Sequence, residues 1–294
     1  MKPVPVRNVR VPLEAKILRF MKTISQLAGH QRLVSGKHGV FVYNLHCFYC
    51  GRALELYGEY CEHEVQLFSK IVQKGDTVWE IGANIGALAV PLAGMVGNNG
   101  CLVAFEPQPE VFNNLAANFA LNCLGWARAL PFALGERPGI VTLPRVFYDR
   151  PGNFGGISLM DSSGGGERVE CRRGDDLSGF LPKPDFVKID VEGMEAGVLR
   201  GMSEMINSAK PVLYVENDRP EKSQHLVELL WSFGYQCWWH IAAYFNADNH
   251  FGLQENLYPD QVAVNMLCMH PGNQRIQITD LPISNAAEHP FSRN

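Results

Sequence analysis

Ionisable residues follow two short apolar runs in this sequence. Glu80 lies in VWEIGANIG, where an apolar run leads into a turn that contains Gly82 and Gly86. A second group lies in KIDVEGME (Lys188–Glu195), at the end of another apolar run. Carboxylates in such positions attract the ammonium or hydroxyl groups of a ligand and repel phosphate. The two stretches therefore predict a site for a polar ligand that is not a simple phosphate.

The glycine turn distinguishes between several kinds of nucleotide site. Gly82 and Gly86 lack Cβ atoms, so backbone can approach a ligand, and a helix that begins after them offers unpaired N–H groups. The triphosphate motif G-x-x-x-x-G-K-[ST] is absent, and so is the three-glycine dinucleotide pattern. Glu106 ends the next apolar run, Cys101–Phe105, where an acidic residue about 20 residues past the turn can bind both hydroxyls of a ribose.

These features favour a nucleoside that carries an amino acid, and S-adenosyl-L-methionine (SAM) fits that description. We assign Glu80 and the backbone around Gly82 to the methionine ammonium, and Glu106 to the ribose. An ordinary strand–turn–helix connection that happens to end in Glu is the alternative. The predicted cofactor-binding residues are Glu80, Gly82, Ala83, Asn84, Gly86, Glu106 and Pro107.

The elements that must position these residues alternate regularly from Gly75 onward. This alternation predicts a parallel sheet with helices on both faces, and ligands of such sheets bind outside the carboxyl ends of the strands. Glu80, Glu106 and Asp190 should therefore face one crevice. Pro91 should kink the first helix or restrict it to its first turns. The predicted strands are 78–81, 101–105, 126–133, 185–190, 211–216, 235–240 and 262–269, and the predicted helices are 61–73, 87–96, 110–121 and 221–233.

Four stretches of the sequence resemble the FkbM family of methyltransferases. They are EIGANIG (Glu80–Gly86), FEP (Phe105–Pro107), the asparagine-rich helix that follows and KIDVEGME, which is the most specific. Glu80 departs from the resemblance, because Asp is more common there. The resemblance implies an α/β, Rossmann-like class I methyltransferase fold, with a mostly parallel seven-stranded sheet whose last strand is reversed. It also implies SAM-dependent methylation of a hydroxyl of a sugar, a glycolipid or polysaccharide precursor, or a secondary metabolite.

The second ionisable group is then the predicted catalytic centre. Asp190 is the leading candidate for a base, with Lys188, Glu192 and His240 nearby. Lys188 and Asp190 share a strand face, and a neighbouring ammonium lowers the pKa of a carboxylate. Asp190 alone would thus be a weak base but a sound metal ligand or positioning group, and His240 could be the base. A hydrogen-bonded histidine at a strand end is the alternative for His240.

Three other functions compete with this interpretation. In a Mg²⁺-dependent O-methyltransferase of the same fold, Asp190 and another carboxylate or Asn would hold the metal. A catalytically inactive SAM-binding module would retain only the cofactor site. The intact KID-x-EG block argues against such a loss of catalysis. A glycosyltransferase does not suit an ammonium-binding Glu80.

The composition is that of a globular protein with small net charge. The 294 residues are 46% hydrophobic and 19% charged, with a net charge of −4, and show no electrostatic footprint for nucleic acid. No apolar run is long enough to span a membrane, and the N-terminus lacks the apolar core of a secretory signal. We expect a small-molecule or glycan acceptor, a cytoplasmic protein and no nucleic-acid partner, with homodimer formation left open.

A group of cysteine and histidine residues could bind a metal ion. Its members are His46, Cys47, Cys50, Cys61 and His63. Cys47 and Cys50 form one C-x-x-C pair, but no second pair exists and the spacing matches no standard zinc finger. We therefore expect buried, reduced thiols with a structural role and no metal.

The sequence divides into three parts. Residues 1–60 are predicted to be a cap extension, residues 61–270 the methyltransferase domain and residues 271–294 a tail. Apolar residues from Leu13 to Leu27 recur at helical spacing and predict an amphipathic helix. We favour a helix that packs on its own domain, and a helix that lies on an anionic membrane surface is the alternative. The glycine-rich stretch within 153–166 is predicted to be a surface insertion that borders the active site.

Overall fold

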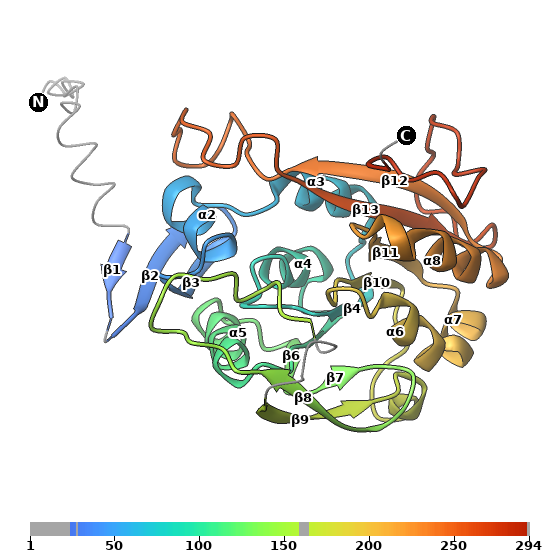
Figure 1. The fold of residues 1–294 in the computed structure, drawn as a ribbon, viewed down its shortest axis with the longest axis horizontal. Helices are drawn as coiled ribbons and strands as arrows, with labels where there is room; N and C mark the ends of the chain where they lie inside the picture. The colour runs from blue at the N-terminus through green and yellow to red at the C-terminus, as the bar shows by residue number, and fades with distance from the viewer. Residues whose placement is uncertain (1–23, 28, 159–164, 293–294) are drawn as a thin grey trace, which may run out of the picture.

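A central seven-stranded sheet organises the protein (Figure 1). The computed structural model describes residues 24–27, 29–158 and 165–292. The strand order is β12-β13-β11-β10-β4-β5-β6. The bounds are β4 (Thr77–Ile81), β5 (Cys101–Phe105), β6 (Ala127–Leu130), β10 (Phe186–Ile189), β11 (Val212–Glu216), β12 (Gln236–Ala243) and β13 (Val262–Met269).

The sheet is parallel except for its last strand. β13 runs antiparallel to both of its neighbours, β11 and β12, whereas the other neighbouring strands pair in parallel. The predicted mostly parallel seven-stranded sheet with a reversed last strand is confirmed. The strand order changes direction at β4, so β4, β5 and β10 open together at their carboxyl ends, where ligands of such sheets bind.

Helices cover both faces of this sheet because successive strand residues point to opposite sides. Val78 belongs to the apolar core shared with α3 (Glu62–Ile71), α4 (Ala89–Val96) and α5 (Pro109–Leu121). Trp79 belongs to the core on the other face, shared with α6 (Glu195–Gly201), α7 (Ser203–Ala209) and α8 (Pro220–Ser232). Figure 1 shows the two helical layers on either side of the sheet.

A small antiparallel sheet of β1 (Ile24–Gln26), β2 (Gln31–Gly36) and β3 (Gly39–Asn44) lies against α5. Asn118 of α5 accepts the N–H of Val42 at 2.6 Å and donates to its carbonyl at 3.1 Å. Asn122 makes the same pair of hydrogen bonds with Val40, at 2.8 and 2.7 Å. The asparagine-rich helix therefore supplies amide side chains that pair with the edge of β3 as another strand would.

A third sheet, with the order β7-β9-β8, is formed by β7 (Ala133–Leu134), β8 (Gly139–Pro144) and β9 (Gly166–Arg172), and the 3₁₀ helix η1 (Asp175–Leu177) follows it. The strand predicted over 126–133 is divided, because β6 ends at Leu130 and β7 pairs in this other sheet. The predicted glycine-rich insertion lies in the long β8–β9 connection.

The helix predicted near the N-terminus can be compared with the structure only in its last residues. Most of the helix predicted from Leu13 to Leu27 lies outside the described residues, but Ile24–Gln26 form β1, so the helical prediction is wrong there. The helix α2 (Cys50–Tyr57) was not predicted. Pro91 lies in the first turn of α4, where its missing N–H costs little, so the helix accommodates it.

The segment predicted to be a tail packs on the domain in residues 271–292. Arg275 pairs with Asp76 at 3.0 Å, and the indole N–H of Trp238 donates to the carbonyl of Asp280 at 3.1 Å. His289 is buried, 2.8 Å from the carbonyl of Asn217. Low apolar density alone does not make a segment peripheral when its polar groups have partners. Within the described residues, no helix combines the length and apolar character needed to cross a membrane.

Candidate functional site

A cavity of about 630 Å³ opens at the carboxyl ends of β4, β5, β10 and β11. Its size lies within the range of small-molecule sites, about 300–1,000 Å³. Gly86 and His240 are not among its lining residues. Nine of the predicted site residues line it: Glu80, Gly82, Ala83, Asn84, Glu106, Pro107, Lys188, Asp190 and Glu192. The glycine-rich segment also reaches the cavity, through Asn153, Gly155, Gly156 and Ile157.

The glycine turn is fixed by close backbone contacts. Gly82 has a φ of +82°, and a Cβ there would collide with the backbone oxygen of Asp190. Gly86 has a φ of +83°, and a Cβ there would lie 2.7 Å from a methyl carbon of Leu115. Both positions therefore require glycine, the first for the joint between β4 and β10 and the second for the contact with α5. Gly86 acts through the shape of the turn.

The N–H groups of this turn, from Gly82 to Gly86, are already hydrogen-bonded. The N–H groups of Gly82 and Ala83 both donate to the carbonyl of Phe105 at 3.0 Å. The next three, from Asn84 to Gly86, donate to a side chain of Glu106, a side chain of Asn84 and a backbone carbonyl, at 2.8–2.9 Å. Residues 82–86 therefore offer no free N–H groups to a phosphate, and ligand groups that face these residues would be held by carboxylates and carbonyls.

Glu106 is held in place by the turn that it faces. Its Oε2 accepts the N–H of Asn84, and its Oε1 accepts the N–H of Gln108, both at 2.9 Å. Burial raises the pKa of Glu106 to about 7, and the two backbone hydrogen bonds partly oppose that shift. Each carboxylate oxygen keeps a second lone pair, so the group can accept two further hydrogen bonds from a diol. We call residues 80–84 and 106–108 the turn wall.

Glu80 is a fully buried carboxylate with one oxygen atom that is unpartnered in the part of the chain that the structure describes. Its Oε2 has no hydrogen-bond partner among the described residues, although the side chain lines the cavity. Burial raises the pKa of Glu80 to about 8; Lys188 opposes this shift, whereas the charge of Asp190 adds to it. A ligand ammonium would relieve both effects, because it supplies the missing donor and the missing positive charge.

Lys188 neutralises the acidic centre of the site. Register places it beside Glu80 of β4 and beside Tyr214 of β11, and its ammonium lies 2.9 Å from Oδ2 of Asp190. Burial alone lowers the pKa of Lys188, but Asp190, Glu80 and Glu64 outweigh burial and raise it above its usual value. Lys188 is therefore a permanent cation here, and it orients Asp190. The predicted shared strand face is confirmed.

Two further carboxylates lie beside Asp190. Glu192, at a φ of +56°, pairs with Arg219 at 2.7 Å. Glu216 ends β11 and was not among the predicted site residues, although the rule that located Glu80 and Asp190 also fits a carboxylate that ends PVLYVE. Oxygen atoms of Asp190, Glu192 and Glu216 lie within 4.8 Å of one another.

His240 is not brought to this centre, contrary to the expectation that placed it near Asp190. Its Nδ1 lies 2.7 Å from the hydroxyl of Tyr214, and burial, followed by the charges of His63 and Lys70, lowers its pKa. The register aligns His240 with Glu216 at the end of β11, but β13 and β11 lie between β12 and β10, so His240 is separated from Asp190 by two strands. His240 therefore agrees with the alternative interpretation, in which it is a hydrogen-bonded histidine of a strand.

The remaining side of the cavity is aromatic. Tyr49 and Tyr60 come from the ends of the segment around α2, and Tyr244, Asp260 and Gln261 come from the connection between β12 and β13. The ring of Tyr244 lies edge-on to Tyr49, at 5.8 Å between centroids, and 6.0 Å from Tyr60. We call these five residues the tyrosine wall.

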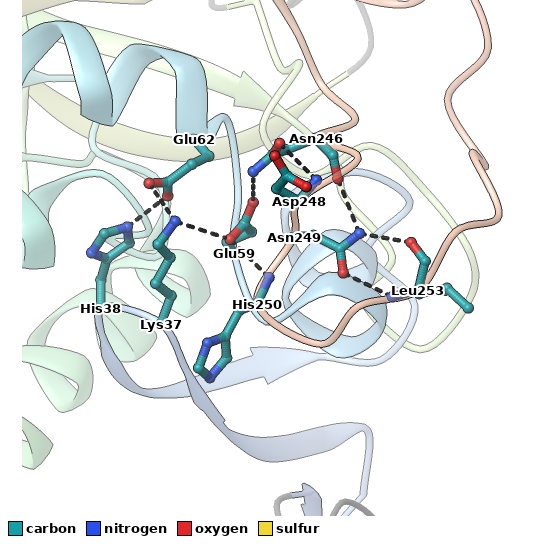
Figure 2. A network of polar contacts seen from close by, with 9 residues as sticks. All are labelled: Lys37, His38, Glu59, Glu62, Asn246, Asp248, Asn249, His250 and Leu253. Atoms are coloured by element: carbon teal, nitrogen blue, oxygen red, sulfur yellow. Dashed lines mark hydrogen bonds and ion pairs between the residues drawn. The ribbon is translucent and has the colours of Figure 1, made fainter.

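A buried glutamate joins the two segments of the tyrosine wall, as Figure 2 shows. Glu59 accepts the side-chain N–H of Asn246 at 2.7 Å and the backbone N–H of His250 at 3.0 Å, and Lys37 lies 3.6 Å away. Asn249 then holds the loop through the N–H and carbonyl of Leu253, at 3.0 and 2.7 Å.

A second glutamate anchors the same region to the small sheet. Glu62 lies 2.8 Å from the ammonium of Lys37 and 2.7 Å from Nε2 of His38, also drawn in Figure 2. The connection from 245 to 261 is thereby fixed against the N-terminal residues rather than against the main sheet. No short sequence motif signals these contacts.

The predicted thiol cluster lies next to the tyrosine wall. Cys47 and Cys50 are buried and line the cavity, and Cys61 is buried as well. Burial raises the pKa of the Cys50 and Cys61 thiols well above the usual value, which favours the neutral thiol over the metal-binding thiolate. A structural role for these thiols remains our prediction.

Comparison with known proteins identifies the family. Residues 80–237 match the Methyltransferase FkbM domain, and this match spans the turn wall, Asp190 and most of the sheet. The chain belongs to the FkbM methyltransferase family. Within that family, the seven-stranded sheet with its reversed strand is the class I methyltransferase fold.

Two curated relatives are also methyltransferases. The chain is 30% identical to the hexuronic acid methyltransferase AglP of Haloferax volcanii, over 55% of this chain and 64% of that protein. It is 30% identical to the methyltransferase sdnD of Sordaria araneosa, over 42% of this chain and 60% of that protein. The chain thus spans less than two thirds of the length of either relative.

Two solved structures of methyltransferases are similar to this chain at low sequence identity. One is methyltransferase FkbM from Methylobacillus flagellatus, with a TM-score of 0.43 and 16% identity over 70% of this chain and 50% of that one. Another is precorrin-6y C5,15-methyltransferase from Geobacter metallireducens, with a TM-score of 0.48 and 14% identity over 71% of this chain and 87% of that one.

Proposed function

We propose that this FkbM family member transfers the methyl group of SAM to a hydroxyl oxygen of a sugar, a glycolipid or polysaccharide precursor, or a secondary metabolite. The turn wall carries this proposal. Its two buried carboxylates, Glu80 and Glu106, meet a turn whose N–H groups are all engaged, so the wall suits an ammonium and a ribose diol and does not suit a phosphate.

The cofactor assignments follow from this geometry. The orphan oxygen of Glu80 and the carbonyls of the turn would hold the methionine ammonium, and Glu106 would accept the ribose hydroxyls. Pro107 and Ala83 would form the surface beside the nucleoside, since both line the cavity. Asp190, held by Lys188, would then lie where the acceptor hydroxyl meets the methyl group.

The tyrosine wall supports an acceptor of the carbohydrate class. Its aromatic rings offer flat apolar surfaces for the C–H faces of a sugar ring, while Asp260 and Gln261 can bind hydroxyl groups. A relative that is named as a hexuronic acid methyltransferase adds support for a sugar acceptor. Methyl transfer needs mainly alignment of the acceptor with the methyl group and exclusion of water, and a cavity lined by two walls would support the alignment.

Binding of three ligand classes tests the proposal. In calorimetry, S-adenosylhomocysteine (SAH) should bind with one-to-one stoichiometry, and NAD and UDP-glucose should not bind. UDP-glucose binding without SAH binding would replace the proposal with a glycosyltransferase, and NAD binding alone would point to a dehydrogenase.

A further inference from the structure

The carboxylate of Glu216 has one oxygen atom without a partner in the described part of the chain. Its Oε2 is hidden from solvent and has no hydrogen-bond partner among the described residues, while the residue lines the cavity. A carboxylate oxygen that is hidden from solvent and lacks a partner is stable only if it gains a proton or a cation.

Two side-chain cations are paired with the carboxylates that lie beside Glu216. Lys188 contacts Oδ2 of Asp190 at 2.9 Å, and Arg219 contacts Oε2 of Glu192 at 2.7 Å. Each contact uses one oxygen of its carboxylate and leaves the other oxygen for a further partner. A carboxylate has about four lone-pair sites, so these ion pairs do not exhaust it.

The three carboxylates are spaced for one small cation. Their oxygen atoms lie within 4.8 Å of one another. Oxygens on opposite sides of a Mg²⁺ or Ca²⁺ ion are separated by about 4–5 Å, twice the usual metal–oxygen distance. The three residues come from the end of β10, from the turn after it and from the end of β11, so the main sheet fixes the positions of two of them.

We propose that Asp190, Glu192 and Glu216 bind one divalent cation of the oxygen-preferring class, Mg²⁺ or Mn²⁺. The buried, unpartnered oxygen of Glu216 distinguishes this cluster from ordinary surface acids. Among the described residues, it is the only group of His, Cys, Asp and Glu side chains with such spacing. The role of the cation, to bind and acidify the acceptor hydroxyl, rests on the proposed function, but its binding does not.

Binding of Mn²⁺ alone tests the site without any acceptor. Electron paramagnetic resonance and calorimetry should show one Mn²⁺ per chain in the wild type, competed by Mg²⁺. Glu216→Gln and Asp190→Asn should each weaken Mn²⁺ binding more than about tenfold, because each removes one charged ligand. Asp260→Asn removes a cavity carboxylate outside the cluster, at a φ of +61° that Asn tolerates, and should leave Mn²⁺ binding unchanged.

SAH titrations on the same samples separate the possible failures. Normal SAH affinity in Glu216→Gln shows that this variant is folded, so its loss of Mn²⁺ then supports the site. SAH binding by a wild type that takes up no Mn²⁺ overturns the cation site and leaves the proposed function standing. Mn²⁺ binding that survives unchanged in both variants also overturns it, because the ion then lies elsewhere. Mn²⁺ binding without SAH binding keeps the site and removes the proposed function.

Discussion

The turn wall and the tyrosine wall of the cavity are assembled differently. The turn wall joins residues close in sequence: Glu106 accepts the N–H of Asn84, 22 positions away. The tyrosine wall joins segments far apart: Glu59 accepts the N–H of Asn246, 187 positions away. Local contacts form from one strand–turn–helix unit, whereas distant ones require the whole sheet to be in place. The turn wall, which we propose binds the cofactor, therefore has a short sequence motif, and the tyrosine wall has none.

Charge differs between the walls as well. The turn wall contains two buried carboxylates without a nearby cation in direct contact, Glu80 and Glu106, and both have raised pKa values. In the tyrosine wall region, Glu59 and Glu62 are paired with Lys37. Carboxylates without a cationic partner are typical of a ligand-binding site, whereas carboxylates in ion pairs are typical of a region that needs no ligand for its stability.

The largest predicted effect is at Asp190, where the two walls meet. Asp190→Asn keeps the shape but removes the charge that Lys188 orients, so turnover should be nearly abolished while SAH affinity stays within a few-fold. Transfer of labelled methyl groups from SAM to the acceptor measures turnover, and calorimetry measures SAH binding. Retention of most activity would move the chemistry to Glu192 or Glu216.

Glu59→Gln tests the tyrosine wall alone. It removes the charge that accepts two N–H groups of the 245–253 loop, and each hydrogen bond to a charged group contributes about 1.5–3 kcal/mol. We expect faster amide exchange in 245–261 and a higher KM for the acceptor, with SAH affinity unchanged. Glu255→Gln removes an exposed charge from the same connection and is the control. A fall in SAH affinity would show that the walls are not independent.

Glu62→Gln gives the smallest predicted effect, and that effect depends on pH. Burial raises the pKa of Glu62, but the hydrogen bonds and charges of His38 and Lys37 outweigh burial and lower it. Its ionised form is therefore favoured by folding, and this stabilisation is present above the unfolded pKa and lost as pH falls through the lower folded pKa. Near neutral pH the variant should melt on the order of 2–5 °C below the wild type. The difference in melting temperature should shrink below about pH 4; a difference that is constant with pH would exclude this charge effect.

The sequence predicted those parts of the molecule that rest on local patterns. β13 has the predicted bounds, Val262–Met269, because a long apolar run between polar segments leaves little choice. Glu80, Glu106 and Asp190 were placed at one crevice by the rule for parallel sheets, and all three line the cavity. Glu216 obeys the same rule and could have been included.

Other features could not be inferred from spacing. The engaged N–H groups of the turn depend on a carbonyl of the neighbouring strand at Phe105, and the separation of His240 from Asp190 depends on the order of the strands in the sheet. The packing of 271–292 depends on polar contacts such as Arg275 with Asp76, which apolar density does not show. The tyrosine wall depends on Glu59, whose partners lie almost 200 residues away.

The most direct test of the central claim compares one carboxylate from each wall. SAH is titrated calorimetrically into the wild type, into Glu106→Ala and into Asp260→Asn. Glu106→Ala should weaken SAH binding by about tenfold to a hundredfold, because hydrogen bonds to a charged group contribute about 1.5–3 kcal/mol. Asp260→Asn should leave SAH affinity unchanged. Unchanged affinity in Glu106→Ala, or an equal loss in both variants, would contradict the assignment of the turn wall to the cofactor.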